Sequence, residues 1–227
     1  MCYESVNERS FTDQKFIAKV KMGDPDSEKG KREMASEARR KLLMEAAVTC
    51  FAESGIARTS MRDIARKAGV SIGNLYNHFP GRDDLIAEIA KMETEGLSGI
   101  VEAARACGER GAAVETFVMR YFDHCAEPVS AVLTIEITSE ALRNPEIGRL
   151  FSGNRSMLIA NLTEAMSLER PGLTRAEEES HRQTAGLILD TVEGFALRAG
   201  LGGKPATDAD KLALMAFIDR AVNENAP

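Results

Sequence analysis

The sequence predicts an all-α protein of about nine helices, in which a small three-helix domain precedes a larger helical domain. Three observations support this prediction. Residues that favour helix, such as alanine, leucine, methionine, glutamate and arginine, dominate, whereas aromatic residues make up 5% of the chain and tryptophan is absent. Apolar residues recur at helical spacing along most of the chain. Proline and glycine interrupt this pattern at intervals that separate one helix from the next.

The charge is distributed unevenly along a chain whose net charge is -6. Residues 29–82 carry eleven lysines and arginines against five acidic residues, which gives +6. Residues 1–28 carry four against six, which gives −2, and residues 83–227 carry fourteen against twenty-four, which gives −10. One basic segment in an acidic protein is typical of a localised phosphate-binding face, although a solvated helix surface would also account for it.

Several classes of protein are disfavoured by what the sequence lacks. It contains no run of eighteen apolar residues, so we expect no membrane span, and residues 1–10 lack the apolar core of a secretory signal. The four cysteines show neither metal-type nor paired spacing: Cys2, Cys50, Cys107 and Cys125. We therefore expect a cytoplasmic protein with reduced thiols, no metal and no cofactor.

The N-terminal 33 residues are predicted to be a disordered extension, because residues 23–30 are rich in helix breakers and charge. A basic arm at its end, formed by Lys29, Lys31 and Arg32, could contact nucleic acid. The first helix is predicted over residues 36–54. Ser36 would cap this helix and Gly55 would end it, since glycine readily adopts the positive φ that follows many helices.

Residues 59–79 carry the most informative pattern in the chain. Ser60 is predicted to cap a helix whose third position is Asp63, a weaker form of the capping box, and Gly69 would end that helix. Ser71 would cap a second short helix, from which Leu75 and Phe79 point to the core. Two short helices joined by a glycine-containing turn form a helix-turn-helix motif, whose second helix can lie in a DNA major groove.

The remaining helices follow from the breaks in the helical pattern. After a turn at residues 80–82, Asp83 and Asp84 suit the first turn of a long helix that ends near residue 106. Further helices are predicted near residues 111–126, 128–143, 146–168, 174–199 and 208–223. Residues 133–138 alternate in a way that would permit a strand, but their flanks favour helix. The predicted domains are therefore residues 34–82 and residues 83–227.

The segment from about residue 38 to residue 90 resembles the DNA-binding domain of the tetracycline-repressor (TetR) family of bacterial transcription regulators. The resemblance rests on an ordered set of pieces: Leu42–Phe51, Ala52–Ile56, Thr59–Ala65, Ala68–Ser71, Gly73–Phe79 and Arg82–Leu85. It implies a homodimer that binds a pseudo-palindromic operator in double-stranded DNA, as a repressor that a small hydrophobic ligand releases. Residues beyond 90 resemble the family only in being helical and of suitable length, so the identity of the effector stays open.

Contacts with DNA phosphates are expected at both ends of the motif. By the resemblance, three side chains contact the backbone, namely Tyr76, His78 and Arg82. Thr59 or Ser60 would add a contact beside the first helix of the motif. Such contacts set the register of a protein on the duplex. Tyr76 could instead lie at the edge of the core, and His78 could be half-buried.

Contacts with base edges are expected from side chains that match the hydrogen-bonding pattern of the major groove. Arg62 suits the two acceptors of guanine, and Asn74 suits adenine, although Asn74 could also be an ordinary surface residue. The remaining residues that face the groove are Ser71, Ile72, Gly73 and Asn77.

The larger domain is predicted to hold the effector and to form the dimer. By the resemblance, the fifth to eighth helices enclose the ligand pocket, for which the candidates are Phe117, Tyr121, His124, Cys125, Ile135, Phe151, Met157, Met166 and His181. The last two helices form the dimer interface, with the candidates Leu187, Ile188, Thr191, Val192, Phe195, Leu214, Phe217 and Ile218. Any of these residues could be ordinary core, and the sequence does not separate core from interface.

Two other functional classes remain as alternatives. A helical di-iron enzyme would need two Glu-x-x-His pairs, and the chain has one, formed by Glu178 and His181. A DNA-binding redox sensor would use Cys107 or Cys125, provided that basic groups lower the pKa of the thiol. No catalytic or metal-binding motif supports an enzyme.

Overall fold

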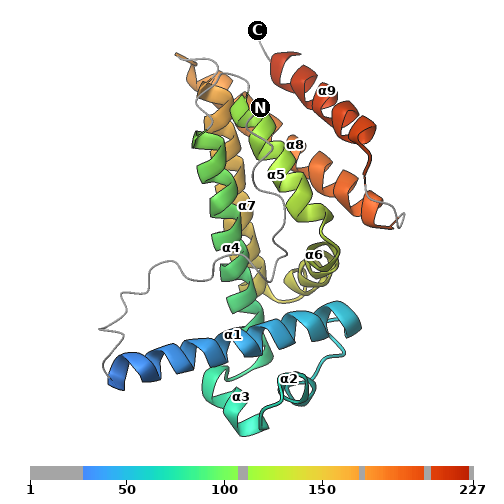
Figure 1. Cartoon of the computed structure of the whole chain (residues 1–227). Coiled ribbons are helices and arrows are strands. Elements are labelled where there is room, and N and C mark those ends of the chain that lie inside the picture. The colour runs from blue at the N-terminus through green and yellow to red at the C-terminus, as the bar shows by residue number, and fades with distance from the viewer. Residues whose placement is uncertain (1–27, 107–111, 169–171, 202–205, 225–227) are drawn as a thin grey trace. The chain divides into compact units, whose positions relative to one another are not determined.

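The computed structural model describes residues 28–106, 112–168, 172–201 and 206–224, and within these stretches it contains helices and no strand (Figure 1). The described helices are α1 (Glu28–Ser54), α2 (Met61–Lys67), α3 (Ile72–His78), α4 (Arg82–Ala106), α5 (Ala112–Ala126), α6 (Pro128–Ala141), α7 (Pro145–Leu168), α8 (Arg175–Leu201) and α9 (Asp208–Glu224). The all-α prediction is confirmed. The segment that would permit a strand, residues 133–138, lies inside α6.

The described residues pack as two compact units. The head unit contains residues 28–93 and 132–151, and the body unit contains the described residues of 94–131 and 152–224. Helices α4, α6 and α7 each continue from one unit into the other. Packing therefore groups most of α6 and the start of α7 with the N-terminal helices, whereas the sequence alone suggests one boundary near residue 82.

Helix α1 begins earlier than the sequence predicts. Residues 28–33, predicted as part of a disordered extension, are helical, because glutamate, lysine and arginine in this stretch favour helix and outweigh Gly30. Ser36 lies inside α1 and does not cap it, so that prediction is wrong. The part of the prediction that concerns residues 1–27 lies outside the described residues.

The core of the head unit forms where α1 packs against α2 and α2 packs against α3. Figure 1 shows α1 lying across these two short helices. The core consists of nearly or fully buried apolar side chains: Leu43, Met44, Phe51, Ile64, Leu75, Phe79, Leu85, Ile86 and Ile89. Burying a large apolar side chain of this kind contributes about 1.5–3 kcal/mol.

Local capping fixes where α2 and α3 begin. The Ser60 side chain accepts a hydrogen bond from the Asp63 backbone N–H, 3.2 Å away, and the Asp63 carboxylate accepts from the Ser60 N–H at 3.1 Å. The predicted capping box is thus complete, and its hydrogen bonds from Ser60 lower the pKa of Asp63. Ser71 caps α3 by accepting from the Asn74 N–H, and Gly69 takes a φ of 66° in the intervening turn. The turn therefore follows from the sequence.

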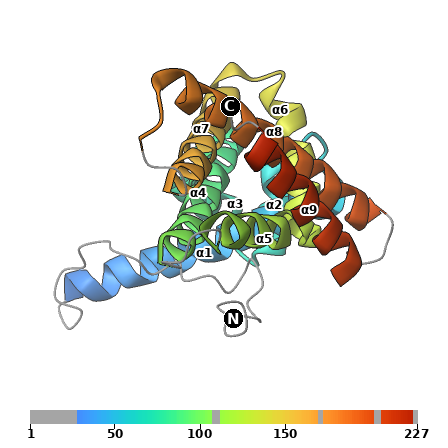
Figure 2. The ribbon, with the colours of Figure 1, turned by 90° about the horizontal axis from the view of Figure 1, so that it is seen from above.

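The body unit is built around α5, which packs against α8 (Figure 2). Helix α9 packs against α8, and the Lys211 ammonium joins it to α5 by pairing with Asp123 at 2.8 Å. The core consists mainly of buried apolar residues such as Phe117, Phe122, Leu162, Leu189 and Ile218. Among the described helices, none has an apolar stretch of the length needed to cross a membrane.

Candidate nucleic-acid interface

Helix α3 has one anchored face and one open face. Leu75 is fully buried and Phe79, which follows the helix, is 1% exposed, so these two residues fix α3 on the core. Elsewhere on the helix Ile72 is 38% exposed and Tyr76 is 49% exposed. Apart from its chain neighbours and the backbone of its own helix, nothing lies within 4 Å of a Cβ placed on Gly73, so this position is open to a close approach.

The three cations of α2 differ in what they contact. Arg66 pairs with Asp63 and Lys67 pairs with Glu53, so much of their charge is balanced locally. Arg62 is exposed, and within the described part of the chain its guanidinium forms no hydrogen bond or ion pair. Arg62 is therefore available to a partner, as its predicted role in reading bases requires.

Two residues lie otherwise than the sequence predicts. Thr59 is buried, and its hydroxyl donates to the Gly55 carbonyl at 2.8 Å and to the Cys50 carbonyl at 3.2 Å, so it holds the α1–α2 linker and does not face a phosphate. Asn74 is half-buried, and its Oδ1 is enclosed with no hydrogen-bond partner among the described residues. The Asn74 amide would have to rotate outward before both of its polar atoms could meet adenine.

The other predicted contacts lie at the surface or near it. Ser71 and Asn77 are exposed, and Ser60 is exposed with its hydroxyl donating to Asp63 Oδ2 at 2.6 Å. His78 is half-buried. Arg82 is also half-buried, and its Nη1 donates to the Ile56 carbonyl at 3.1 Å, so part of its donor capacity is used inside the head unit.

Arg40 is a structural residue that sequence reasoning misses. Its guanidinium lies 4.5 Å from the centre of the Phe79 ring, pairs with Glu88 at 2.8 Å and donates to the His78 carbonyl. It thereby joins α1, the end of α3 and α4. Burial alone raises the pKa of Glu88, but hydrogen bonds from Arg40 and Lys91 outweigh it and lower that pKa. No local sequence signal pairs positions 48 residues apart.

The predicted ligand-pocket residues divide between the two units. Ile135 and Phe151 belong to the head unit, where Ile135 is exposed and Phe151 half-buried. The other seven belong to the body unit. Four of these are buried, namely Phe117, Tyr121, Met166 and His181, and three are half-buried, namely His124, Cys125 and Met157.

The body unit contains a small cavity. A cavity of about 10 Å³, roughly the space for one water, lies among Val101, Ala104, Arg105, Ala113, Phe117, Asn161, Glu164 and Ala165. Phe117 is the predicted pocket residue that lines it. Sites for small ligands usually enclose several hundred Å³, so a ligand at this cavity would require it to enlarge.

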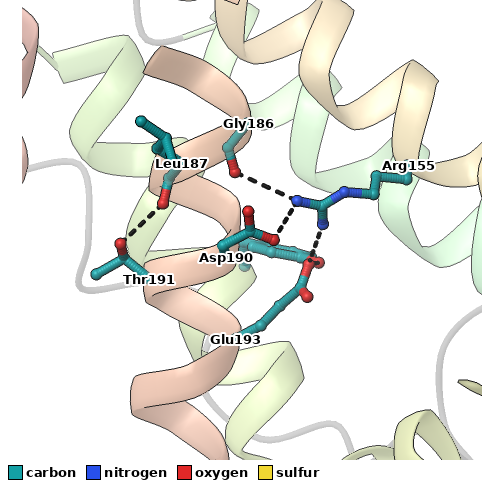
Figure 3. A network of polar contacts seen from close by, with 7 residues as sticks. Arg155, Gly186, Leu187, Asp190, Thr191 and Glu193 are labelled. Atoms are coloured by element: carbon teal, nitrogen blue, oxygen red, sulfur yellow. Dashed lines mark hydrogen bonds and ion pairs between the residues drawn. The ribbon is translucent and has the colours of Figure 1, made fainter. Parts of the chain in front are cut away.

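A network of polar side chains joins three helices of the body unit (Figure 3). Arg155 on α7 donates to Glu193 at 2.9 Å, to Asp190 and to the Gly186 carbonyl at 3.3 Å, all on α8. The Tyr121 hydroxyl on α5 donates to the same Glu193 oxygen at 2.7 Å. Burial, together with the neighbouring carboxylate, raises the pKa of Tyr121, so the phenol stays protonated.

Helices α8 and α9 show which predicted interface residues are free at the surface. Ile188, Val192, Leu214 and Ile218 are buried within the described chain, so they belong to its own core. Phe195 is half-buried against Phe122, and Thr191 is half-buried with its hydroxyl donating to the Leu187 carbonyl. Leu187 is 67% exposed and Phe217 50% exposed, and Leu212 is more exposed still. Among the described residues of α8 and α9, these three and Leu201, which is 76% exposed, are the exposed large apolar side chains.

Two family models match the chain in succession. Residues 43–89 match the model described as bacterial regulatory proteins of the tetR family, which covers the capped turn and the open face of α3. Residues 111–223 match the model described as the C-terminal part of BetI-type transcriptional repressors. The chain belongs to the TetR family. It is a DNA-binding transcriptional regulator, as are the relatives it matches.

Individual relatives of this TetR regulator match over different lengths. It is 30% identical to the transcriptional repressor KstR2 of Rhodococcus jostii over 55% of this chain, which spans little more than half, 57%, of that protein. It is 27% identical to the transcriptional regulator BetI of Cronobacter sakazakii over 74% of this chain and 82% of that one.

Solved structures show the same TetR fold. Salmonella enterica GusR matches with a TM-score of 0.66 and 23% identity, covering 82% of this chain and 96% of GusR. A transcriptional regulator of Saccharomonospora viridis, solved in complex with choline, matches with a TM-score of 0.68 and 19% identity, covering 81% and 96%.

The geometry bears on the two alternative functions of this TetR regulator. Glu178 is exposed whereas His181 is buried, and no group of three metal-ligating side chains occurs among the described residues. Cys50 is buried, and burial raises the pKa of its thiol, which opposes thiolate formation. Cys125 is half-buried. Cys2 and Cys107 lie outside the described residues.

Proposed function

We propose that this regulator binds a pseudo-palindromic operator as a homodimer and represses transcription until a small hydrophobic ligand releases it. The observations that carry the DNA-reading part are the exposed residues of α3 and, on the adjoining α2, Arg62, which has no partner among the described residues. This surface lies in the one basic segment of an acidic chain, so it attracts phosphates while the remainder of the protein repels them. A dimer that covers a promoter needs no further surface to block transcription.

Individual residues of the head unit take distinct roles in the proposed complex. Arg62 donates to guanine O6 and N7, and Ile72 contacts a thymine methyl. Tyr76, His78 and Ser60 contact backbone phosphates, which fix the register. Thr59 is left out because it is buried, whereas Ser60 is exposed. Lys31 and Arg32 are exposed on the early part of α1 and add charge beside the duplex, whereas the side chain of Lys29 lies outside the described residues.

The homodimer is supported by the α8–α9 surface. Leu187, Leu212 and Phe217 leave large apolar side chains in water, which a second copy of the same surface would cover. A single two-turn helix such as α3 spans only a few base pairs, so a monomer would discriminate poorly. Two copies related by a two-fold axis place two such helices on half-sites about 34 Å apart, which requires an inverted repeat.

Selection of bound sequences from a random duplex pool tests the proposal. The full chain is expected to enrich one inverted repeat, with an affinity that falls steeply as salt increases because phosphate contacts release counterions. A pool that stays random after repeated rounds at low salt would overturn it.

Ligand release is the second part of the proposal. Methionines such as Met157 and Met166 give the body unit side chains that can rearrange around varied apolar ligands. Because the present cavity holds about one water, we expect ligand binding to enlarge it and to favour a form with lower operator affinity. Thermal unfolding of the chain with hydrophobic compounds, and with choline, identifies binders. A bound compound that leaves operator affinity unchanged would contradict effector-controlled release.

A further inference from the structure

The turn between α1 and α2 is held from both sides. The Ile56 backbone N–H donates to Glu136 Oε2 at 2.8 Å, and the Ile56 carbonyl accepts from Arg82 Nη1 at 3.1 Å. Glu136 lies on α6, 80 residues away in sequence, yet it belongs to the same head unit. A carboxylate that accepts from a backbone N–H forms a charge-assisted bond, which is stronger than a neutral one.

The approach of Glu136 is so close that it restricts the residue beside Ile56. Gly55 has a φ of 82°, and a Cβ placed on it would lie 3.0 Å from Glu136 Oε2 and 3.2 Å from Oε1. Any side chain at position 55 would therefore strain the backbone and displace the carboxylate. The position of the Glu136 carboxylate therefore depends on a glycine at position 55.

A second contact ties residues 132–151 to the N-terminal part of the head unit. The Asn144 side-chain amide donates to Asp83 Oδ2 at 3.0 Å, at the start of α4. Asn144 Oδ1 accepts from the Glu146 N–H, which fixes the start of α7. Ile137 and Ile147 from this segment are nearly fully buried. The α6–α7 corner is therefore an integral part of the head unit.

The Gly55–Ile56 turn comes shortly before α2 and α3, the helices that are proposed to face DNA. The Thr59 hydroxyl donates to the Gly55 carbonyl at 2.8 Å, so a displacement of Gly55 moves the residue that precedes the α2 cap. Ser60 then caps α2, which carries Arg62 and packs against α3. Four residues separate Ile56 from the start of the capped helix.

We propose that Glu136 is a positioning residue for DNA recognition, which locks the Gly55–Ile56 turn and thereby sets the placement of α2 and α3. The proposal rests on the proposed function, because it concerns the same DNA-reading surface. In this role Glu136 does not contact DNA itself. Since α6 starts in the body unit and carries Glu136 in the head unit, a displacement of α6 that withdraws the carboxylate would release the turn.

Three substitutions of Glu136 in the full chain separate the effect of its side-chain length from the effect of its charge. Glu136→Asp keeps the charge but shortens the side chain, and Glu136→Ala removes both, so both are expected to raise the hydrogen-exchange rate of the Ile56 amide about tenfold or more. Both should weaken binding to the selected operator by about tenfold. Glu136→Gln keeps an acceptor oxygen at the same reach but makes the bond neutral, so it should change both measurements less than Glu136→Asp and Glu136→Ala do.

The control is Glu140→Ala, one helical turn further along α6, where the glutamate faces Arg143 instead of the turn. It should leave Ile56 exchange and operator affinity unchanged. Gly55→Ala should reproduce the effect of Glu136→Asp from the other side of the contact, which keeps the proposal testable if Glu136→Ala does not fold.

The outcomes are distinct. If Glu136→Asp accelerates Ile56 exchange but the operator affinity equals that of the wild type, the positioning role is wrong. Unchanged exchange of the Ile56 amide in Glu136→Asp and Glu136→Ala would show that Glu136 does not hold the turn. If the wild type enriches no operator, the proposed function is wrong, and the positioning role is wrong as well. The exchange rates of the Ile56 amide would still show whether Glu136 holds the turn.

Discussion

The arginines of the head and body units show how the two regions differ. Arg62 in the head unit is exposed and has no partner among the described residues, whereas Arg155 in the body unit donates to three acceptors on α8. An unpaired guanidinium at the surface is free to bind a partner, and one with several acceptors holds helices together. The head unit thus keeps at least one cation at its surface, although Arg40 and Arg82 are bonded within it, and the body unit uses Arg155 to join α7 to α8.

The largest expected effect comes from deleting a buried leucine in either unit. Leu75→Ala in α3 and Leu189→Ala in α8 each remove a side chain that is fully buried, so each should lower the free energy of unfolding by about 3 kcal/mol. Urea denaturation measures this loss. Leu142→Ala is the control, because Leu142 is 85% exposed and should cost less than about 0.5 kcal/mol. Equal losses at all three positions would contradict the assigned burial.

Charge placed on the exposed apolar surface of the body unit tests its role in dimerisation. Leu187→Glu combined with Phe217→Glu should raise the dimer dissociation constant by about a hundredfold, because two carboxylates per copy would be buried or brought together. Sedimentation velocity measures the change. Leu142→Glu, on the head unit, should leave the dimer intact. A double variant that remains dimeric at the same concentrations as the wild type would move the interface elsewhere.

The polar network of the body unit is expected to have a smaller effect. Tyr121→Phe removes one of the hydrogen bonds that Glu193 accepts and should cost about 1 kcal/mol of unfolding free energy. Arg155→Ala should cost about 1–2 kcal/mol, and the double variant should cost less than the sum of the two, since both residues contact Glu193. Strict additivity in urea denaturation would show that the network does not act as a unit.

Acid should weaken the head unit through Glu88, with the smallest effect. The pKa of Glu88 in the folded chain lies below its ordinary value of 4.5, so its pairing with Arg40 stabilises the protein above about pH 4.5. That contribution, about 1 kcal/mol or less, is lost as the pH falls through the lowered pKa. Unfolding measured from pH 6 to pH 3 should decline less steeply in Glu88→Gln. Identical slopes would argue against this pair as a source of acid sensitivity.

The sequence predicts what depends on neighbouring residues and misses what depends on distant ones. The caps at Ser60 and Ser71, the turn at Gly69 and the ends of the later helices follow from residues a few positions apart, and the structure confirms them. The sequence does not reveal that Thr59 is buried, because its hydroxyl bonds backbone carbonyls that a pattern cannot show. Nor does it reveal contacts between distant positions, such as Ile56 with Glu136.

The same limit applies to the helices of the body unit. Apolar residues on α8 and α9 recur at helical spacing whether they fill the core or face solvent, so Ile188 and Leu187 look alike in sequence. The structure separates them, because one is 1% exposed and the other 67%. The predicted pocket shows a related problem: residues of suitable chemistry, such as Ile135, belong to a different unit.

Titration of the selected operator and of a scrambled duplex with the wild type, Arg62→Ala and Arg182→Ala tests the central claim most directly. Arg182 is an exposed arginine of the body unit and serves as the matched control. We predict that Arg62→Ala weakens operator binding by about ten- to a hundredfold and leaves the scrambled duplex nearly unaffected, since a base contact carries sequence discrimination. Equal losses for Arg62→Ala and Arg182→Ala, or none for either, would contradict DNA reading by this face.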